Sequence, residues 1–163
     1  MSVGGATNQA ASLLSASLKD ELAALRDFAV ALQQEQQALV AGEIDKLAPI
    51  VEEKARLAAS LNRFAEQRQR LIGQGVPADR SGLETWMAAQ PLSPPDRSSW
   101  TKLLALTKEA QALNETNGKL IAMRMQHNQQ ALNVLLSAAN QATLYGPDGQ
   151  TKPAGGGHLF GKA

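Results

Sequence analysis

The sequence predicts an all-α protein. Ala, Leu and Gln contribute 28, 23 and 15 of the 163 residues, while aromatic residues make up only 4%. This composition is typical of long helices rather than of sandwiches or barrels. Apolar residues also recur at alternating steps of four and three, which is the spacing of one helix face. We expect an antiparallel helical hairpin plus a long C-terminal helix, packed as a coiled-coil-like bundle in a single domain with a flexible tail.

The first helix is expected at about residues 12–41, after a disordered N-terminus at 1–12. Gly42 ends its pattern, because glycine tolerates the left-handed conformation at a helix terminus. The apolar stripe consists of Leu18, Leu22, Leu25, Ala29, Leu32 and Leu39, with Gln36 at one position and Leu14 and Phe28 beside it.

The second helix is expected at about residues 45–73. Pro49 lies in its first turn, where the missing N–H has no helical partner in any case. Its stripe consists of Leu47, Val51, Leu57, Leu61, Phe64, Leu71 and Ile72. Two helices of similar length joined by a tight turn at Gly42 predict the antiparallel hairpin.

A connector from Gly73 to Pro95 holds one short helix, expected at about residues 82–89. Ser81 and Glu84 have the spacing of a capping box that would start it. We expect Trp86 and Met87 to pack it onto the bundle.

The last helix is expected at about residues 94–143, with Ser93 as its cap and Asp96 at the positive end of its dipole. At about 1.5 Å per residue it would exceed the hairpin by roughly 25–30 Å. Part of this helix would then lack a partner within the chain. The segment after it, 144–163, is expected to be a flexible tail, rich in Gly.

The C-terminal part of the last helix is amphipathic but carries no charge. From Met125 to Pro147 there is no Asp, Glu, Lys or Arg. Its apolar residues are Ala131, Leu132, Leu135, Leu136, Ala138, Ala139 and Ala142, opposite Gln and Asn residues. Such a stripe must be covered by a helix of a partner protein, by the chain's own core or by a second copy in a homodimer. Periodicity does not decide between these three interpretations.

Polar residues interrupt the same helix at positions where a stable coiled coil has Leu or Ile. They are Asn114, Asn117, Arg124 and Asn128. Residues of this kind lower stability and fix the register of packed helices. Gly118, in the same region, predicts a bend or a register device. Charged residues of the second helix are expected to be solvated: Glu52, Glu53, Lys54, Arg63, Arg68 and Arg70.

The sequence gives no support for an enzyme, a cofactor or a metal site. His127 has no Glu or His three or four residues away, and His158 lies in a Gly-rich segment that cannot hold a geometry. A net charge of +1 with both signs interspersed provides no basic surface for nucleic acid. Neither a signal peptide nor a membrane span is visible, so the expected location is the cytoplasm.

Three segments together resemble the FlgN family of bacterial flagellar export chaperones, over about residues 15–151. The first runs from Glu52 to Leu71. The second joins Asn114-Glu-Thr-Asn-Gly-Lys-Leu-Ile121 to His127-Asn-Gln-Gln-Ala-Leu132. The third is Thr143-Leu-Tyr-Gly-Pro-Asp-Gly-Gln-Thr151. The connector from Gly73 to Pro95 and the Gly-rich end of the chain depart from the family pattern.

The resemblance implies a cytoplasmic, non-enzymatic type III secretion chaperone. It would bind the C-terminal helical regions of the hook-filament junction proteins FlgK and FlgL, prevent their premature assembly and deliver them to the flagellar export gate. The residues implied in binding these proteins are Asn117, Leu120, Ile121, Asn128, Ala131, Leu132, Leu135 and Leu136.

The resemblance also implies that the tail docks to the export gate component FlhA through Leu144, Tyr145 and Gly146. The export ATPase complex and a second copy of this chain are further candidate partners. Two other functions fit the same helices: a self-associating coiled-coil scaffold, and an adaptor of another secretion complex.

Overall fold

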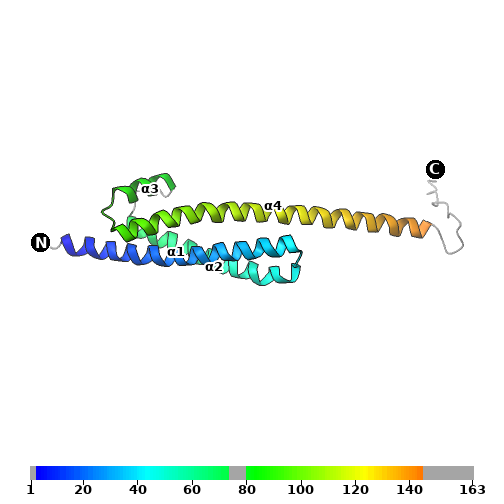
Figure 1. Ribbon diagram of the computed structural model, residues 1–163, viewed down its shortest axis with the longest axis horizontal. Coiled ribbons are helices and arrows are strands. Elements are labelled where there is room, and N and C mark those ends of the chain that lie inside the picture. The colour runs from blue at the N-terminus through cyan, green and yellow to red at the C-terminus, as the bar shows by residue number, and fades with distance from the viewer. Residues whose placement is uncertain (1–2, 74–79, 145–163) are drawn as a thin grey trace, which may run out of the picture. The chain divides into compact units, whose positions relative to one another are not determined.

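The computed structural model describes residues 3–73 and 80–144, and these residues form helices joined by short connections (Figure 1). The elements are α1 (Val3–Ala41), the 3-10 helix η1 (Ile44–Lys46), α2 (Leu47–Ile72), α3 (Arg80–Ala89) and α4 (Pro94–Leu144). No strand occurs among the described residues. The predicted all-α fold is therefore confirmed.

The chain divides into two units, Met1–Ile121 and Ala122–Ala163. The boundary falls within α4, whose 51 residues contribute to both units. Unit 1 contains α1, α2, α3 and the first part of α4. The described part of unit 2 is the remainder of α4.

The helices α1 and α2 form an antiparallel hairpin (Figure 1). Gly42 takes the left-handed conformation, with φ of 76°, and the N–H of Glu43 donates to the carbonyl oxygen of Ala38 at 2.9 Å. These features close α1 as its glycine predicts. Lys54, near the start of α2, pairs with Glu35 near the end of α1, whereas Arg68 near the end of α2 pairs with Glu21. The hairpin prediction is confirmed.

The first helix is longer than expected. It begins at Val3 rather than near residue 12, so α1 has 39 residues against 26 in α2, and the two helices are not of similar length as expected. The reason is that periodicity detects only a buried face. Before Leu13 the sequence has no large apolar residue except Val3 and Met1, and the described side chains of Gln9, Ala11 and Ser12 are exposed.

The start of α4 is fixed by a capped first turn. The Ser93 hydroxyl accepts a hydrogen bond from the N–H of Asp96 at 3.3 Å and donates one to the Asp96 carboxylate at 2.6 Å. The hydroxyl of Ser15 on α1 donates to the other Asp96 oxygen at 2.6 Å. Both hydroxyl donors lower the pKa of Asp96 from its ordinary value of 3.8, with Ser15 the larger cause. The expected start of this helix is confirmed.

The helix α3 packs its apolar side chains against the core of unit 1. Met87 is fully buried, and Trp86 is partly buried against the same core. The prediction for these two residues is confirmed. The helix begins at Arg80, so Ser81 lies inside it rather than at its cap, and the Thr85 hydroxyl donates to the Ser81 carbonyl at 2.9 Å.

The central core cluster of unit 1 comes from α1, α3 and α4, while α2 contributes the buried Leu57 and the partly buried Leu61 and Leu71. Its buried members are Leu14, Leu18, Leu22, Leu25, Leu32, Met87, Trp100, Leu103 and Ala110. The first five follow the stripe read from the sequence of α1.

Candidate functional site

The candidate site is the apolar face of α4 in unit 2. Six large apolar residues of this unit are exposed: Met123, Met125, Leu132, Val134, Leu135 and Leu136. Leu135 is 66% exposed and Leu136 is 54% exposed, whereas the core leucines Leu18 and Leu32 are almost completely buried. Exposed apolar residues grouped on one helix mark an interaction surface. We call Ala131, Leu132, Leu135 and Leu136 the C-terminal stripe.

Exposure extends along the whole described length of this segment. Every side chain described from 122 to 141 is exposed except that of Arg124, which is half-buried. The uncharged polar face includes a hydrogen bond from the Gln129 amide to the Asn133 amide oxygen at 3.1 Å. Asn128, predicted as part of the binding site, is exposed like its neighbours. The segment therefore presents an apolar face and a neutral polar face to solvent.

The remaining predicted binding residues lie at the end of unit 1. Ile121 is 40% exposed and Leu120 is half-buried. Asn117 is only 1% exposed and is bonded to α1, so its assignment to a partner-binding surface is wrong. From the sequence alone, a polar residue on an apolar stripe can contact either a partner protein or another helix of the same chain. In this structure Asn117 contacts α1 of the same chain.

Asn117 belongs to a buried polar cluster that joins three helices. Its amide Nδ2 donates to the carbonyl oxygen of Leu32 and to a carboxylate oxygen of Glu35, both at 2.8 Å. The ammonium of Lys54 on α2 binds both oxygens of Glu35 at 2.8 and 3.0 Å, and also reaches the Asn114 amide oxygen at 3.4 Å. Glu35 is 2% exposed, so this cation offsets much of the free energy required to bury its carboxylate. We call Glu35, Lys54 and Asn117 the polar triad.

Another ion pair crosses the hairpin nearer to α3. Arg68 on α2 pairs with Glu21 on α1, and both side chains are nearly buried. The Arg68 guanidinium also lies over the ring of Trp100 on α4, 5.8 Å from its centroid, within the range of a cation–π interaction. Arg68 thus contacts both α1 and α4, and it stabilises unit 1 in the same way as Lys54.

The expectation that Lys54 and Arg68 are solvated is wrong. The signal that could have corrected it is on α1, where Glu21 and Glu35 lie two heptads apart among the buried leucines. Buried carboxylates at core positions require cations on the facing helix. The other charges of α2 are exposed or paired locally: Arg56 binds Glu53 three residues earlier, which lowers the pKa of Glu53.

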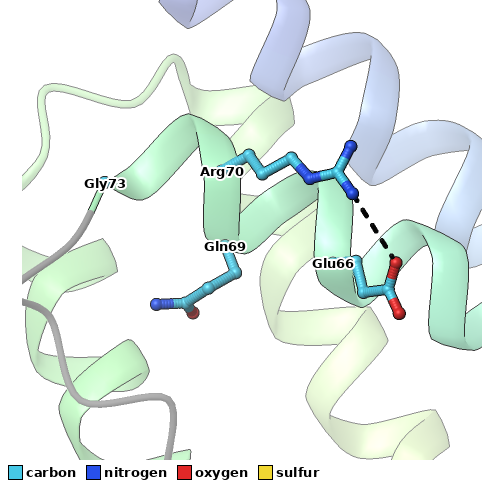
Figure 2. Close-up of a pocket in the computed structure, with 4 residues that line it drawn as sticks. All are labelled: Glu66, Gln69, Arg70 and Gly73. Carbon is cyan, nitrogen blue, oxygen red and sulfur yellow. Dashed lines mark ion pairs between the residues drawn. The ribbon is translucent and has the colours of Figure 1, made fainter.

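A hollow at the end of α2 is lined by Glu66, Gln69, Arg70 and Gly73 (Figure 2). Figure 2 shows the Arg70 and Glu66 side chains directed toward each other, with a nitrogen to oxygen distance of 3.9 Å. Both side chains are more than two thirds exposed, so this pair contributes little. The four lining residues include no Ser, Thr, Cys, Lys or His.

The described residues hold no group of three or more His, Cys, Asp or Glu side chains able to bind a metal ion. His127 is exposed on α4. No helix within residues 3–73 and 80–144 is long and apolar enough to cross a membrane.

The predicted gate-docking residues fall at the limit of the described chain. Leu144 is the last residue of α4. Tyr145 and Gly146 lie outside the described residues, as do the rest of the expected tail and residues 1–2 of the expected N-terminal segment.

Comparisons with known proteins agree on one family. The family model described as FlgN protein matches residues 10–153. Flagella synthesis protein FlgN of Proteus mirabilis is 34% identical over 134 residues, covering 81% of this chain and 85% of that protein. The protein of the same name from Salmonella typhimurium is 33% identical over 129 residues, covering 78% and 81%. That of Escherichia coli is 30% identical over 139 residues, covering 83% and 88%. No solved structure matches significantly.

Proposed function

This chain belongs to the FlgN family, and on that premise we propose that it is a cytoplasmic, non-enzymatic flagellar export chaperone. Its cargo would be the hook-filament junction proteins FlgK and FlgL, bound through their C-terminal helical regions. The chaperone would prevent their premature assembly and deliver them to the type III export gate. The relatives' shared name, flagella synthesis protein, supports a role in building the flagellum.

The observation that carries this proposal is the exposed, charge-free C-terminal stripe. Leu132, Leu135 and Leu136 are each about half exposed or more. Burying one leucine completely is worth about 1.5–3 kcal/mol, so partial burial of several could drive association with a helix. An apolar helix of the cargo would gain the same protection from water while it awaits assembly.

The proposed mechanism is an exchange of helix contacts. In the cytoplasm the stripe covers an apolar helix face of the cargo. In the assembled filament neighbouring subunits cover the same face instead of the chaperone. Leucine and alanine side chains provide area without aromatic anchors, which suits an affinity low enough for release. The exchange requires neither a cofactor nor a metal ion.

Delivery would use the tail that follows α4. Under this proposal Leu144, Tyr145 and Gly146 dock the loaded chaperone to FlhA, while the export ATPase complex is a further candidate contact. A tyrosine buries a large amphipathic ring with few rotatable bonds, which suits transient recognition. Tyr145→Ala should then reduce secretion and leave cargo binding unchanged. Loss of cargo binding in this variant would instead place Tyr145 in the cargo site.

The direct test is binding of a purified C-terminal fragment of FlgK. We expect the wild-type chain to bind it and the double variant Leu132→Asp, Leu135→Asp to lose binding, with unchanged helix content by circular dichroism. The matched control is Gln130→Asp with Ser137→Asp, which places the same charges on the polar face of the same turns. Binding that survives in the stripe variant would contradict the assignment of the site.

The same stripe could be covered by a second copy of the chain, as in a coiled-coil scaffold. Light scattering of the pure protein separates these functions. An obligate oligomer at low concentration, dissociated by the stripe substitutions, would favour the scaffold over the chaperone. An adaptor of another secretion complex would remain monomeric and fail to bind the FlgK fragment.

A further inference from the structure

The apolar face of α4 in unit 2 is wider than one neighbouring helix requires. Val134, Leu135 and Leu136 are consecutive and 67%, 66% and 54% exposed. At about 100° per residue, three consecutive residues extend over about 200° of the helix circumference. An amphipathic helix packed on one side of a core has an apolar stripe of roughly 100°. The excess width calls for more than one covering helix.

The face has two flanks on either side of Leu135. Leu132 and Leu136 are four residues apart and form the first flank. Ala131, Val134 and Ala138 follow steps of three and four and form the second flank. Ser137 and Gln130 lie on the remaining arc, among the uncharged polar residues. Each flank therefore has the spacing of a separate helix contact.

The first part of α4 shows how such a helix is covered by a pair. In unit 1, Asn117 bonds to Glu35 on α1, while Asn114 is within hydrogen-bond distance of Lys54 on α2. Two helices that pack on each other thus contact α4 through adjacent positions. The heptad positions of Ala110 and Asn117 continue along the sequence to Arg124, Ala131 and Ala138.

We propose that the face of α4 in unit 2 binds two packed helices of its cargo, one along Leu132 and Leu136 and one along Ala131, Val134 and Ala138. This inference rests on the proposed function and specifies the cargo as a helix pair. The two contacting faces of the cargo carry no charge at the centre of the contact. A Lys or Glu buried there would lack an oppositely charged Asp, Glu, Lys or Arg, because α4 has none of these residues from Met125 to Leu144.

Site-specific fluorescence tests this geometry. The chain has no Cys, so the single variants Val134→Cys, Leu136→Cys and Ser137→Cys can each carry one environment-sensitive dye. On addition of the purified C-terminal FlgK fragment, dyes at both 134 and 136 should shift to the blue. The dye at 137, on the polar arc, should stay unchanged.

Each other result overturns the inference in a different way. A shift at only one of 134 and 136 would indicate a single bound helix, with the chaperone function intact. Binding without a shift at either position would place the cargo elsewhere. No binding by the wild-type chain would remove the proposed function, and the helix pair with it. Shifts that appear on concentrating the chain alone would assign the face to a second copy.

Affinity provides a measurement without dyes. Val134→Gln and Leu136→Gln should each weaken binding of the FlgK fragment about tenfold, because each removes one apolar anchor from a different flank. Ser137→Gln is the matched control and should leave the Kd unchanged. An effect confined to one flank would overturn the helix pair.

Discussion

The amide of Asn117 on α4 donates a hydrogen bond of 2.8 Å to the buried carboxylate of Glu35 on α1. The same amide donates to the Leu32 carbonyl oxygen, one turn earlier on α1. The Asn117 amide can reach both acceptors on α1 only if α4 does not slide along α1. The two hydrogen bonds therefore fix the axial position of α4 in unit 1. The polar triad therefore fixes the register that an apolar contact alone would leave adjustable.

Removing this donor should destabilise unit 1. For Asn117→Ala we expect a loss of about 1–3 kcal/mol, because Glu35 and the Leu32 carbonyl each lose a buried hydrogen bond. Urea denaturation followed by circular dichroism measures the change. The control Asn128→Ala removes the same group from an exposed position of α4. It should alter stability by no more than about 0.5 kcal/mol, and a similar loss in both variants would contradict the role of the triad.

Removing the cation of the triad should have a larger effect. In Lys54→Met the carboxylate of Glu35 stays buried without its counter-charge, and we expect a loss of about 2–3 kcal/mol, below the full range for an entirely buried pair. Lys46→Met is the matched control, since Lys46 pairs with Glu43 on the exposed surface. The double variant Glu35→Leu, Lys54→Met should recover much of the loss. An unstable double variant would show that the pair itself stabilises the bundle.

The hydrogen bonds to Asp96 predict a dependence of stability on pH. Because Ser15 and Ser93 lower the pKa of Asp96 in the folded protein, its contribution is present above the ordinary value of 3.8 and is lost as the pH falls through the lower folded value. Ser15→Ala removes the larger cause. It should therefore reduce the difference in unfolding free energy between neutral pH and about pH 3. An identical pH profile in the variant and the wild type would refute the coupling.

Gly118 offers a stabilising substitution. Apart from its chain neighbours and the backbone of its own helix, an added methyl group at this position would meet no atom within 4 Å, and the helix continues through it. Gly118→Ala should raise stability by about 0.5–1 kcal/mol, visible as a higher Tm. Gly73→Ala is the opposite control, because Gly73 has φ of 92° and an alanine there is strained. A loss of stability in Gly118→Ala would show that α4 requires flexibility at this point.

The helices were predictable where a local signal marks them. Gly42 and Ser93 lie at helix ends whose chemistry can be read from neighbouring residues, and the leucine stripe of α1 marks a buried face. The sequence from Val3 to Ala11 carries no stripe of large apolar residues, so periodicity does not predict this part of α1. Gly118 predicts a bend or a register device, but no other helix comes within 4 Å of the position of an added methyl group there, and Asn117 beside it sets the register.

For the candidate site, the sequence indicates an uncovered face, and the binding of a partner there stays a prediction. The absence of charge after Met125 indicated a face that needs a partner, and Leu132, Leu135 and Leu136 are exposed as that reading requires. Asn117 was assigned to the same face because one helix sequence cannot show which of its turns the hairpin covers. The roles of Lys54 and Arg68 depend on which residues of α1 they face, and that pairing follows from the tertiary register.

The charge-free stretch of α4 should make binding on this face insensitive to ionic strength. Dissolved ions weaken an association by screening the charges on the two surfaces. From Met125 to Leu144 there is no Asp, Glu, Lys or Arg for them to screen. A complex formed on this face should therefore keep nearly the same affinity when the ionic strength rises from dilute buffer to physiological salt, because screening has nothing to act on there.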